Sequence, residues 1–348
     1  MTKKAKKTFF TVLQLAVFIG LGVFLVWYMY HSMQPDAKVQ MMRAIKSARL
    51  IYLVPVLFVG FFSHYFRALR WRLLLEPLDI KPTRLNTWCA VMIGYLVNAI
   101  LPRFGEVAKC TVLARYEKVP ADKMVGTIVA ERAFDLVCLV IVFIAAFALE
   151  APIIGDYARR TFNGSNGHTA LYVLVGIVVV VLLILAFYQR IKRTKIGHAI
   201  KGIGEGVRSI GHLRHRGLFI IYTFAIWACY VGMIVLGFLA MPSMANLPLL
   251  STALVVLSFG AVSMIFTPGG MGAYPYVIGA VLVEFHSHYS IGSTLNEATG
   301  NANAYGSLSW AAQTGVIVIL GLISLILLPI YNRTPHNAQI AVDTKPDL

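Results

Sequence analysis

Long apolar segments constrain this chain more than any other feature of its sequence. Several runs extend for roughly 18–25 residues with few charges, the length of a helix that crosses a bilayer core of ~30 Å. The composition agrees, because 58% of the residues are hydrophobic and only 13% are charged. We therefore predict an all-α, polytopic membrane helix bundle. The apolar runs cover residues 9–30, 50–69, 87–102, 124–149, 169–187, 217–240, 249–266 with 271–284, and 305–330.

The charged residues exclude several classes of protein. The net charge of +16 lies in short stretches between apolar runs, which favours the anionic cytoplasmic face of a membrane over nucleic acid as the partner. The four cysteines are widely separated, so the sequence predicts neither a disulfide framework nor a metal site. Since no polar stretch is long enough to form a catalytic domain, we expect no cofactor and no enzyme activity.

Two apolar runs are interrupted, and the positive charges indicate how they lie in the membrane. The run 87–102 is short and ends at Pro102, and the run 249–284 is broken at Pro268. If both return to the side they entered and the N-terminus is inside, 24 of the 31 lysines and arginines are cytoplasmic. A full crossing by 87–102 would move 13 of them outside, against the positive-inside rule. We predict about six full spans, two re-entrant hairpins and cytoplasmic termini.

The chain is expected to form a single transmembrane domain over residues 1–332, with a polar tail at 333–348. Its first run is too long for a signal peptide and is interpreted as an uncleaved span. Residues 188–216 are basic and predict a segment at the lipid interface. Segments 50–149 and 217–330 share the order span, broken segment, span, so an inverted repeat is a further hypothesis.

The most informative charges are Glu131, Arg132 and Asp135, which lie within the span 124–149. Each charge near the middle of a bilayer costs about 2.5–3.5 kcal/mol, so these side chains must contact protein, water or a ligand. Glu131 and Asp135 share one helix face, and Arg132 can pair with Asp135 three residues on. Two interpretations stay open and are compatible: an ion-pair cluster that holds helices together, and a pathway for substrate or protons.

Two interrupted segments and one basic segment supply further candidates. In the first interrupted segment, Arg103 and Lys109 could reach the acids of span 124–149 and bind a phosphate, or belong to a cytoplasmic loop. In the second, backbone amides freed at the break could bind an anion, or the break could be a close-packing bend. Arg67 and Arg70 could be a basic anchor at the lipid surface or the first contact of an anionic headgroup. The remaining candidates are Asn98, Glu106, Pro268, Gly269, Gly270, Gly272 and Tyr274.

Three ordered motifs resemble one known family. They are the segment from Asn98 to Lys109, the Glu131-Arg132-x-x-Asp135 motif, and Pro268-Gly269-Gly270-Met271-Gly272. The chain resembles the lysylphosphatidylglycerol synthase transmembrane-region family, the flippase-like domain of the multiple peptide resistance factor, over about residues 10 to 330. In larger relatives a soluble domain attaches lysine to the lipid. This chain ends soon after its last span, so we do not expect that activity here.

The resemblance implies a lipid-translocating protein of the bacterial cytoplasmic membrane, with two departures from the family pattern. Tyr274 and Pro275 stand where relatives usually carry a glutamate, and the region Trp310–Gln313 stands where they tend to carry an arginine. We predict binding and translocation of a polar or anionic lipid, with membrane lipids as partners and a homo-oligomer as a further hypothesis. The alternative is a non-transporting protein that presents a lipid carrier to an envelope glycosyltransferase.

Overall fold

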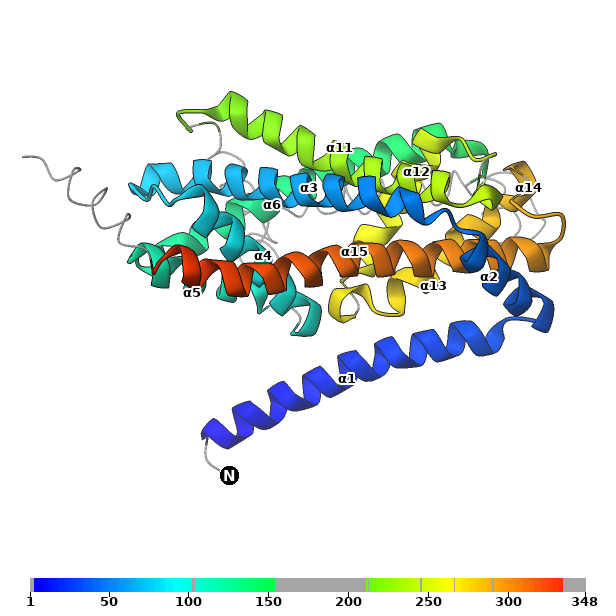
Figure 1. The fold of residues 1–348 in the computed structure, drawn as a ribbon, viewed down its shortest axis with the longest axis horizontal. Coiled ribbons are helices and arrows are strands. Elements are labelled where there is room, and N and C mark those ends of the chain that lie inside the picture. The colour runs from blue at the N-terminus through cyan, green and yellow to red at the C-terminus, as the bar shows by residue number, and fades with distance from the viewer. Residues whose placement is uncertain are drawn as a thin grey trace, which may run out of the picture.

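The computed structural model describes residues 3–101, 104–153, 211, 213–244, 246–265, 267–289 and 291–333. Within these ranges all the regular elements are helices (Figure 1). The expected span 169–187, nearly all of the basic segment 188–216 and the tail from residue 334 lie outside the described residues.

Four helical segments are long and apolar enough to cross a membrane: Leu50–Leu78, Ala121–Leu149, Arg216–Ala240 and Leu295–Tyr331. They contain or form the helices α3 (Leu53–Leu75), α6 (Ala121–Leu149), α11 (Arg216–Ala240) and α15 (Leu295–Tyr331). They confirm the prediction of a multi-pass membrane helix bundle.

Helix α15 begins at Leu295, well before the expected start of the last span at 305. The cause is a helix cap, because the Thr294 hydroxyl accepts a hydrogen bond of 3.2 Å from the Glu297 amide. The polar first turns of this helix lie beyond the apolar run that the sequence marks.

The long helices form the frame of the bundle, and shorter helices fill its ends. Helices α3 and α15 run in one direction, while α6 and α11 return (Figure 1). At one end lie α4 (Arg84–Ile100) and α5 (Gly105–Glu117), which pack against each other as a helical hairpin. At the other end, α12 (Leu249–Ser263) and α13 (Ala273–Glu284) are joined through the short 3₁₀ turn η4 (Pro268–Gly270).

The two hairpins point toward each other and meet inside the bundle. The turn η4 packs against α4, and a Cβ atom added to Gly269 would lie 3.4 Å from the Cα of Ala99. Between its long helices the first half has α4 and α5, and the second half has α12 and α13 followed by the one-turn helix α14 (His286–Tyr289). The interrupted segments of the sequence are therefore neighbours in space, near the middle of the long helices (Figure 1).

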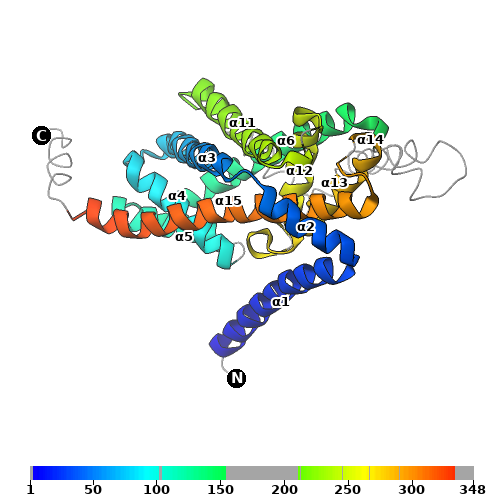
Figure 2. The ribbon, with the colours of Figure 1, turned by 45° about the vertical axis from the view of Figure 1, so that its right-hand side comes forward.

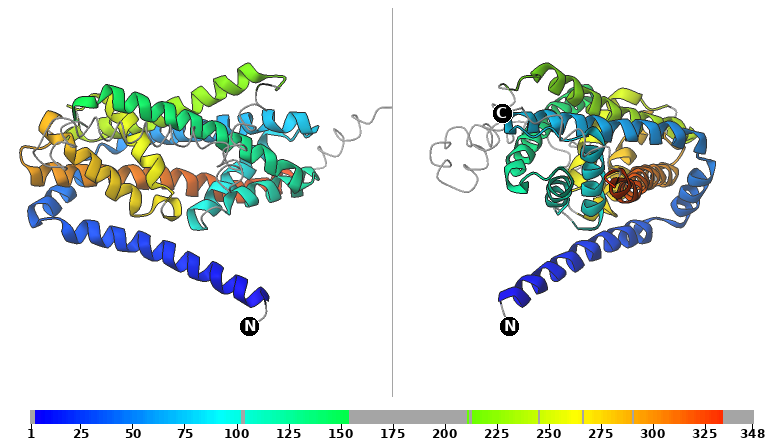
Figure 3. Two further views of the ribbon diagram at one scale, coloured as in Figure 1. Left: turned by 180° about the vertical axis from the view of Figure 1, so that it is seen from behind. Right: turned by 60° about the vertical axis from the view of Figure 1, so that its left-hand side comes forward.

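The first two helices lie at the side of the bundle. Helix α1 (Lys3–Ser32) inclines away from it toward the N-terminus, as all views show (Figures 1, 2 and 3). Helix α2 (Pro35–Ser47) packs along α15 and was not predicted from the sequence. Its start does carry helix signals, because Pro35 is in the first turn and Asp36 suits the positive end of the helix dipole.

Two apolar cores stabilise the two ends of the bundle. One contains Trp71, Leu75, Met92, Leu113 and Phe219 and joins α3, α4, α5 and α11. The other joins α11, α12, α13 and α15. Its large members include Phe238, Met241, Ile278, Leu282 and Tyr305.

Thr83 links the two helices of the first hairpin. Its hydroxyl accepts a hydrogen bond from the Asn86 amide at the start of α4 and lies 2.9 Å from Glu117 Oε1 at the end of α5. Loss of a threonine cap typically costs about 1 kcal/mol. Thr83→Ala should therefore lower the free energy of unfolding in detergent by about 1 kcal/mol. Thr83→Ser should restore it, and equal unfolding temperatures for the alanine variant and the wild type would contradict the cap.

Candidate functional site

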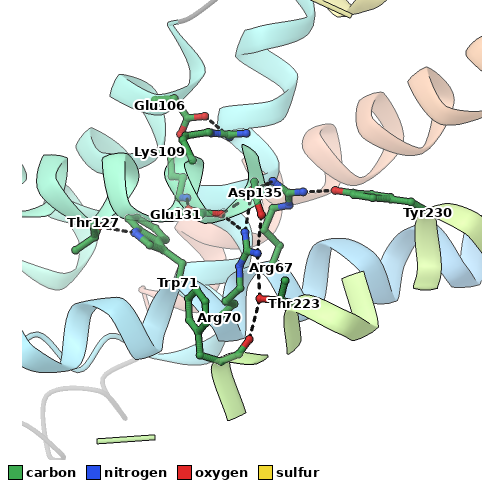
Figure 4. Close-up of polar contacts among 12 residues, drawn as sticks. Arg67, Arg70, Trp71, Glu106, Lys109, Thr127, Glu131, Asp135, Thr223 and Tyr230 are labelled. Atoms are coloured by element: carbon green, nitrogen blue, oxygen red, sulfur yellow. Dashed lines mark hydrogen bonds and ion pairs between the residues drawn. The ribbon is translucent and has the colours of Figure 1, made fainter. Parts of the chain in front are cut away.

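A buried ion-pair cluster joins α3, α5 and α6. Arg70 on α3 binds both carboxylate oxygens of Asp135, at 2.7 and 3.0 Å, and lies 3.2 Å from Glu131 Oε1 (Figure 4). Arg70 and Glu131 are fully buried. The planar guanidinium suits this geometry, because its fork of N–H donors matches two carboxylate oxygens at once. Arg70 thus contacts both acids on the shared helix face that the sequence predicts.

Lys109 completes the cluster from α5. Its Nζ donates to Glu131 Oε2 at 2.8 Å and lies 4.1 Å from the centre of the Trp71 ring. The Trp71 indole in turn donates to Thr127 at 2.9 Å (Figure 4). The expected approach of Lys109 to the acids of α6 is therefore present, while Arg103 lies outside the described residues.

Arg132 does not form the expected pair with Asp135. It pairs with Glu106 at the start of α5. The reason is competition, because Arg70 already occupies both oxygens of Asp135. The Arg132 side chain is 46% exposed, so it keeps donors available beyond its acid partner.

Arg67 is buried beside the cluster without an acid of its own. Its nearest carboxylate oxygen among the described residues is Asp135 Oδ2, at 3.7 Å, and that carboxylate already holds Arg70. Arg67 donates to the Tyr230 hydroxyl, and its guanidinium lies 5.3 and 5.7 Å from the ring centres of Tyr95 and Tyr230. The interpretation of Arg67 and Arg70 as an anchor at the lipid surface is wrong, because both side chains are buried inside the bundle.

The cluster carries an unbalanced charge. Four cationic side chains contact three carboxylates, so one positive charge is left over among the described members. The members are Arg67, Arg70, Lys109, Arg132, Glu106, Glu131 and Asp135.

A cavity of about 310 Å³ lies next to this cluster, between the two hairpins. Arg67, Arg132 and His64 contribute polar lining, and most other lining residues are apolar. Sequence reasoning missed His64, Tyr95, Tyr230 and Gln313 as site residues. The full lining is Gly60, His64, Arg67, Tyr95, Arg132, Tyr230, Met233, Ile234, Val256, Leu257, Gly260, Ala261, Met264, Tyr274, Gln313, Val316 and Ile317.

No described residue of the turn between α12 and α13 lines the cavity itself, although Met264 before it and Tyr274 after it do. Gly269, Gly270 and Gly272 have φ angles of 55°, 74° and 72°, which confirms the expected backbone break. The Trp310 indole donates to the Gly269 carbonyl at 2.9 Å, which ties the turn to α15. Because this carbonyl already accepts a hydrogen bond from the protein, it needs no ligand. The turn therefore acts at least partly as a close-packing bend.

Tyr274 follows this turn and is buried against α12 and α15. Its ring fits where Gly260 leaves space, because a Cβ at Gly260 would lie 2.7 Å from the ring. Gln313 on α15 donates to its hydroxyl at 3.3 Å. A neutral hydrogen-bonded pair therefore stands on the cavity wall.

Asn98 stabilises the first hairpin and does not line the large cavity. Its side-chain oxygen accepts a hydrogen bond of 2.8 Å from the Gly105 amide, where α5 begins. A small cleft beside it is lined by Asn98, Gly105, Glu106, Lys109 and Arg132. Within the described residues, no group of three or more histidine, cysteine or acidic side chains could hold a metal ion.

The comparison with known families decides the identity of the chain. The family described as the lysylphosphatidylglycerol synthase TM region matches residues 11–296. The chain belongs to this family. No curated protein and no solved structure matches it.

The Tyr274–Gln313 contact joins the two regions in which the sequence departs from the family pattern that it resembles. These two residues stand in the regions where the family resemblance implies a glutamate and an arginine. The structure brings them together at 3.3 Å, so the two departures concern one contact.

Proposed function

We propose that this protein binds a polar or anionic lipid in the cavity between the hairpins and translocates it across the bacterial cytoplasmic membrane. One observation carries the proposal: the 310 Å³ cavity is lined both by arginines and by apolar side chains such as Met233, Leu257 and Val316. Cavities of ligand-binding sites typically measure about 300–1,000 Å³. A ligand that matches both kinds of lining residue is amphipathic and anionic.

The arrangement of the hairpins supports translocation over binding alone. Two interrupted segments that enter from opposite ends and meet at a central site are typical of transporters with inverted repeats. Re-entrant hairpins and cytoplasmic termini belong to this proposal, together with headgroup contact by Arg67 and Arg132. In this mechanism the acyl chains stay in the bilayer while the headgroup crosses through the cavity.

Reconstitution of the purified chain with a labelled anionic lipid tests the proposal. Arg132→Ala should slow lipid movement at least about tenfold, because a charge-assisted hydrogen bond is worth about 1.5–3 kcal/mol. The matched control is Arg115→Ala, an exposed arginine on α5 outside the cavity, which should move lipid at the wild-type rate.

Either of two results would contradict the proposal. Equal rates for Arg132→Ala and the wild type would show that the cavity is not the path. If the wild-type chain binds lipid and moves none, a protein that presents a lipid carrier to an envelope glycosyltransferase becomes the better interpretation.

A further inference from the structure

We propose that the cavity selects a phosphodiester lipid with one net negative charge and no amine in its headgroup. In this assignment Arg67 is the main partner of the phosphate. The inference rests on the proposed lipid-binding function and specifies its substrate class. It follows from the charge of the cluster, the groups around Arg67, and the neutral Tyr274–Gln313 pair that also lines the cavity.

The charge of the ligand follows from Arg67, which only shares carboxylates that bind other cations more closely. Arg70, Lys109 and Arg132 each have a carboxylate within hydrogen-bonding distance, whereas Arg67 lies 3.7 Å from one that is already taken. An uncompensated charge inside a membrane protein is costly, so a site with one surplus cation favours a ligand with one negative charge. A phosphodiester carries that single charge, whereas a phosphomonoester carries about −1.5 to −2 at neutral pH.

Polar atoms of Arg67 and of two neighbouring side chains also lack hydrogen-bond partners in the part of the chain that the structure describes. Arg67 Nε, His64 Nδ1 and the Tyr95 hydroxyl are buried and have no hydrogen-bond partner among the described residues. Buried polar groups in native proteins are nearly always paired. All three residues line the cavity, and the His64 and Tyr95 rings are tilted against each other with centres 4.8 Å apart. Phosphate oxygens bound at this wall could accept hydrogen bonds that the protein does not provide.

The rest of the wall disfavours an amine. Among its described lining residues the cavity has no aspartate or glutamate to pair with an ammonium group. The Arg67 guanidinium already lies 5.3 Å from the Tyr95 ring centre and donates to the Tyr230 hydroxyl. The Tyr274–Gln313 pair instead presents neutral hydrogen-bonding groups, which suit the hydroxyls of a polyol or sugar headgroup.

Binding of short-chain lipids to the purified full-length chain in dodecyl maltoside tests the inference. The probes are dioctanoyl phosphatidylglycerol, the corresponding zwitterionic ethanolamine lipid, the phosphatidic acid, and a short polyprenyl phosphohexose. At least one of the two amine-free diesters should bind about tenfold more tightly than the ethanolamine lipid, and more tightly than the phosphatidic acid. Whichever of the two diesters binds more tightly shows whether the headgroup belongs to a glycerophospholipid or to a polyprenyl lipid. Equal affinities for all four lipids would overturn the inference, as would a preference for the ethanolamine lipid or the phosphatidic acid.

Two variants test the role of charge independently. Arg67→Gln should weaken binding of the amine-free diesters about tenfold, and it should also weaken the ethanolamine lipid, whose phosphate is a diester too. Gln313→Glu keeps Arg67 but adds a negative charge to the wall, so it should remove the preference for the diester. The matched control is Gln34→Glu, an exposed position before α2 that should bind like the wild type. An unchanged preference in Gln313→Glu would overturn the charge argument even if Arg67→Gln failed to fold.

This inference and the proposed function can fail separately. Selective binding of a diester by a chain that moves no lipid would refute translocation and leave the substrate class in place. Movement of lipid without selectivity between the diester and the ethanolamine lipid would overturn the substrate class and leave translocation in place.

Discussion

Glu131→Gln is expected to lower the free energy of unfolding by about 3–5 kcal/mol, the usual cost of breaking a buried ion pair from one side. Glu131 is fully buried and holds Lys109 at 2.8 Å and Arg70 at 3.2 Å. Glutamine keeps the shape of the side chain but removes its charge. Two cations then lose their shared partner inside the bundle.

Unfolding of the purified protein in mixed micelles measures this loss. The matched control is Asp122→Asn on the same helix, because Asp122 is exposed in the first turn of α6. Its contribution through the helix dipole is about 0.3–1 kcal/mol, so the control variant should unfold close to the wild type. Equal losses in both variants would show that Glu131 is not the centre of the cluster.

A double variant separates the pair from general disruption. In Glu131→Gln with Lys109→Met, one uncompensated cation is removed together with the acid. The double variant should therefore lose less stability than the sum of the two single variants. Simple additivity would mean that the contact between Lys109 and Glu131 contributes no coupling energy.

The long spans could be predicted from the sequence because hydropathy and length act within one segment. Helices α3, α6, α11 and α15 each contain a run that the sequence marks, and the break at Gly269 and Gly270 follows from residue type. The same local signals place Glu131 and Asp135 on one helix face. Such features need no knowledge of neighbouring helices.

The partners of the charges could not be predicted, because they depend on how distant helices pack. Spacing along α6 favoured a pair between Arg132 and Asp135, yet Arg70 from α3 takes Asp135 and Glu106 takes Arg132. Three charged residues within one membrane span do require partners. The positions of Arg67 and Arg70 on a shared face near the end of α3 were the signal that could have indicated them.

Gly105→Ala is expected to be the most damaging single-methyl change in the first hairpin. A Cβ atom at Gly105 would collide with the Gly94 carbonyl and with the Asn98 side chain, whose nitrogen would lie 2.6 Å away. The carbonyl belongs to the backbone of α4 and cannot rotate aside as a side chain could. Overpacking of this kind costs about 1–3 kcal/mol or more, and separation of the helices also breaks the Gly105–Asn98 hydrogen bond, worth about 1 kcal/mol.

The effect of Gly105→Ala should extend to the charged cluster, because α5 carries both Glu106 and Lys109. If α5 moves away from α4, Lys109 loses its 2.8 Å contact with Glu131 and Arg132 loses Glu106. We expect a lower unfolding temperature together with weaker lipid binding. Gly126→Ala on α6 is the matched control: nothing lies within 4 Å of its added Cβ, and alanine favours a helix by about 1 kcal/mol. If both variants keep wild-type stability, the close contact of α4 with α5 does not hold the acids and bases in place.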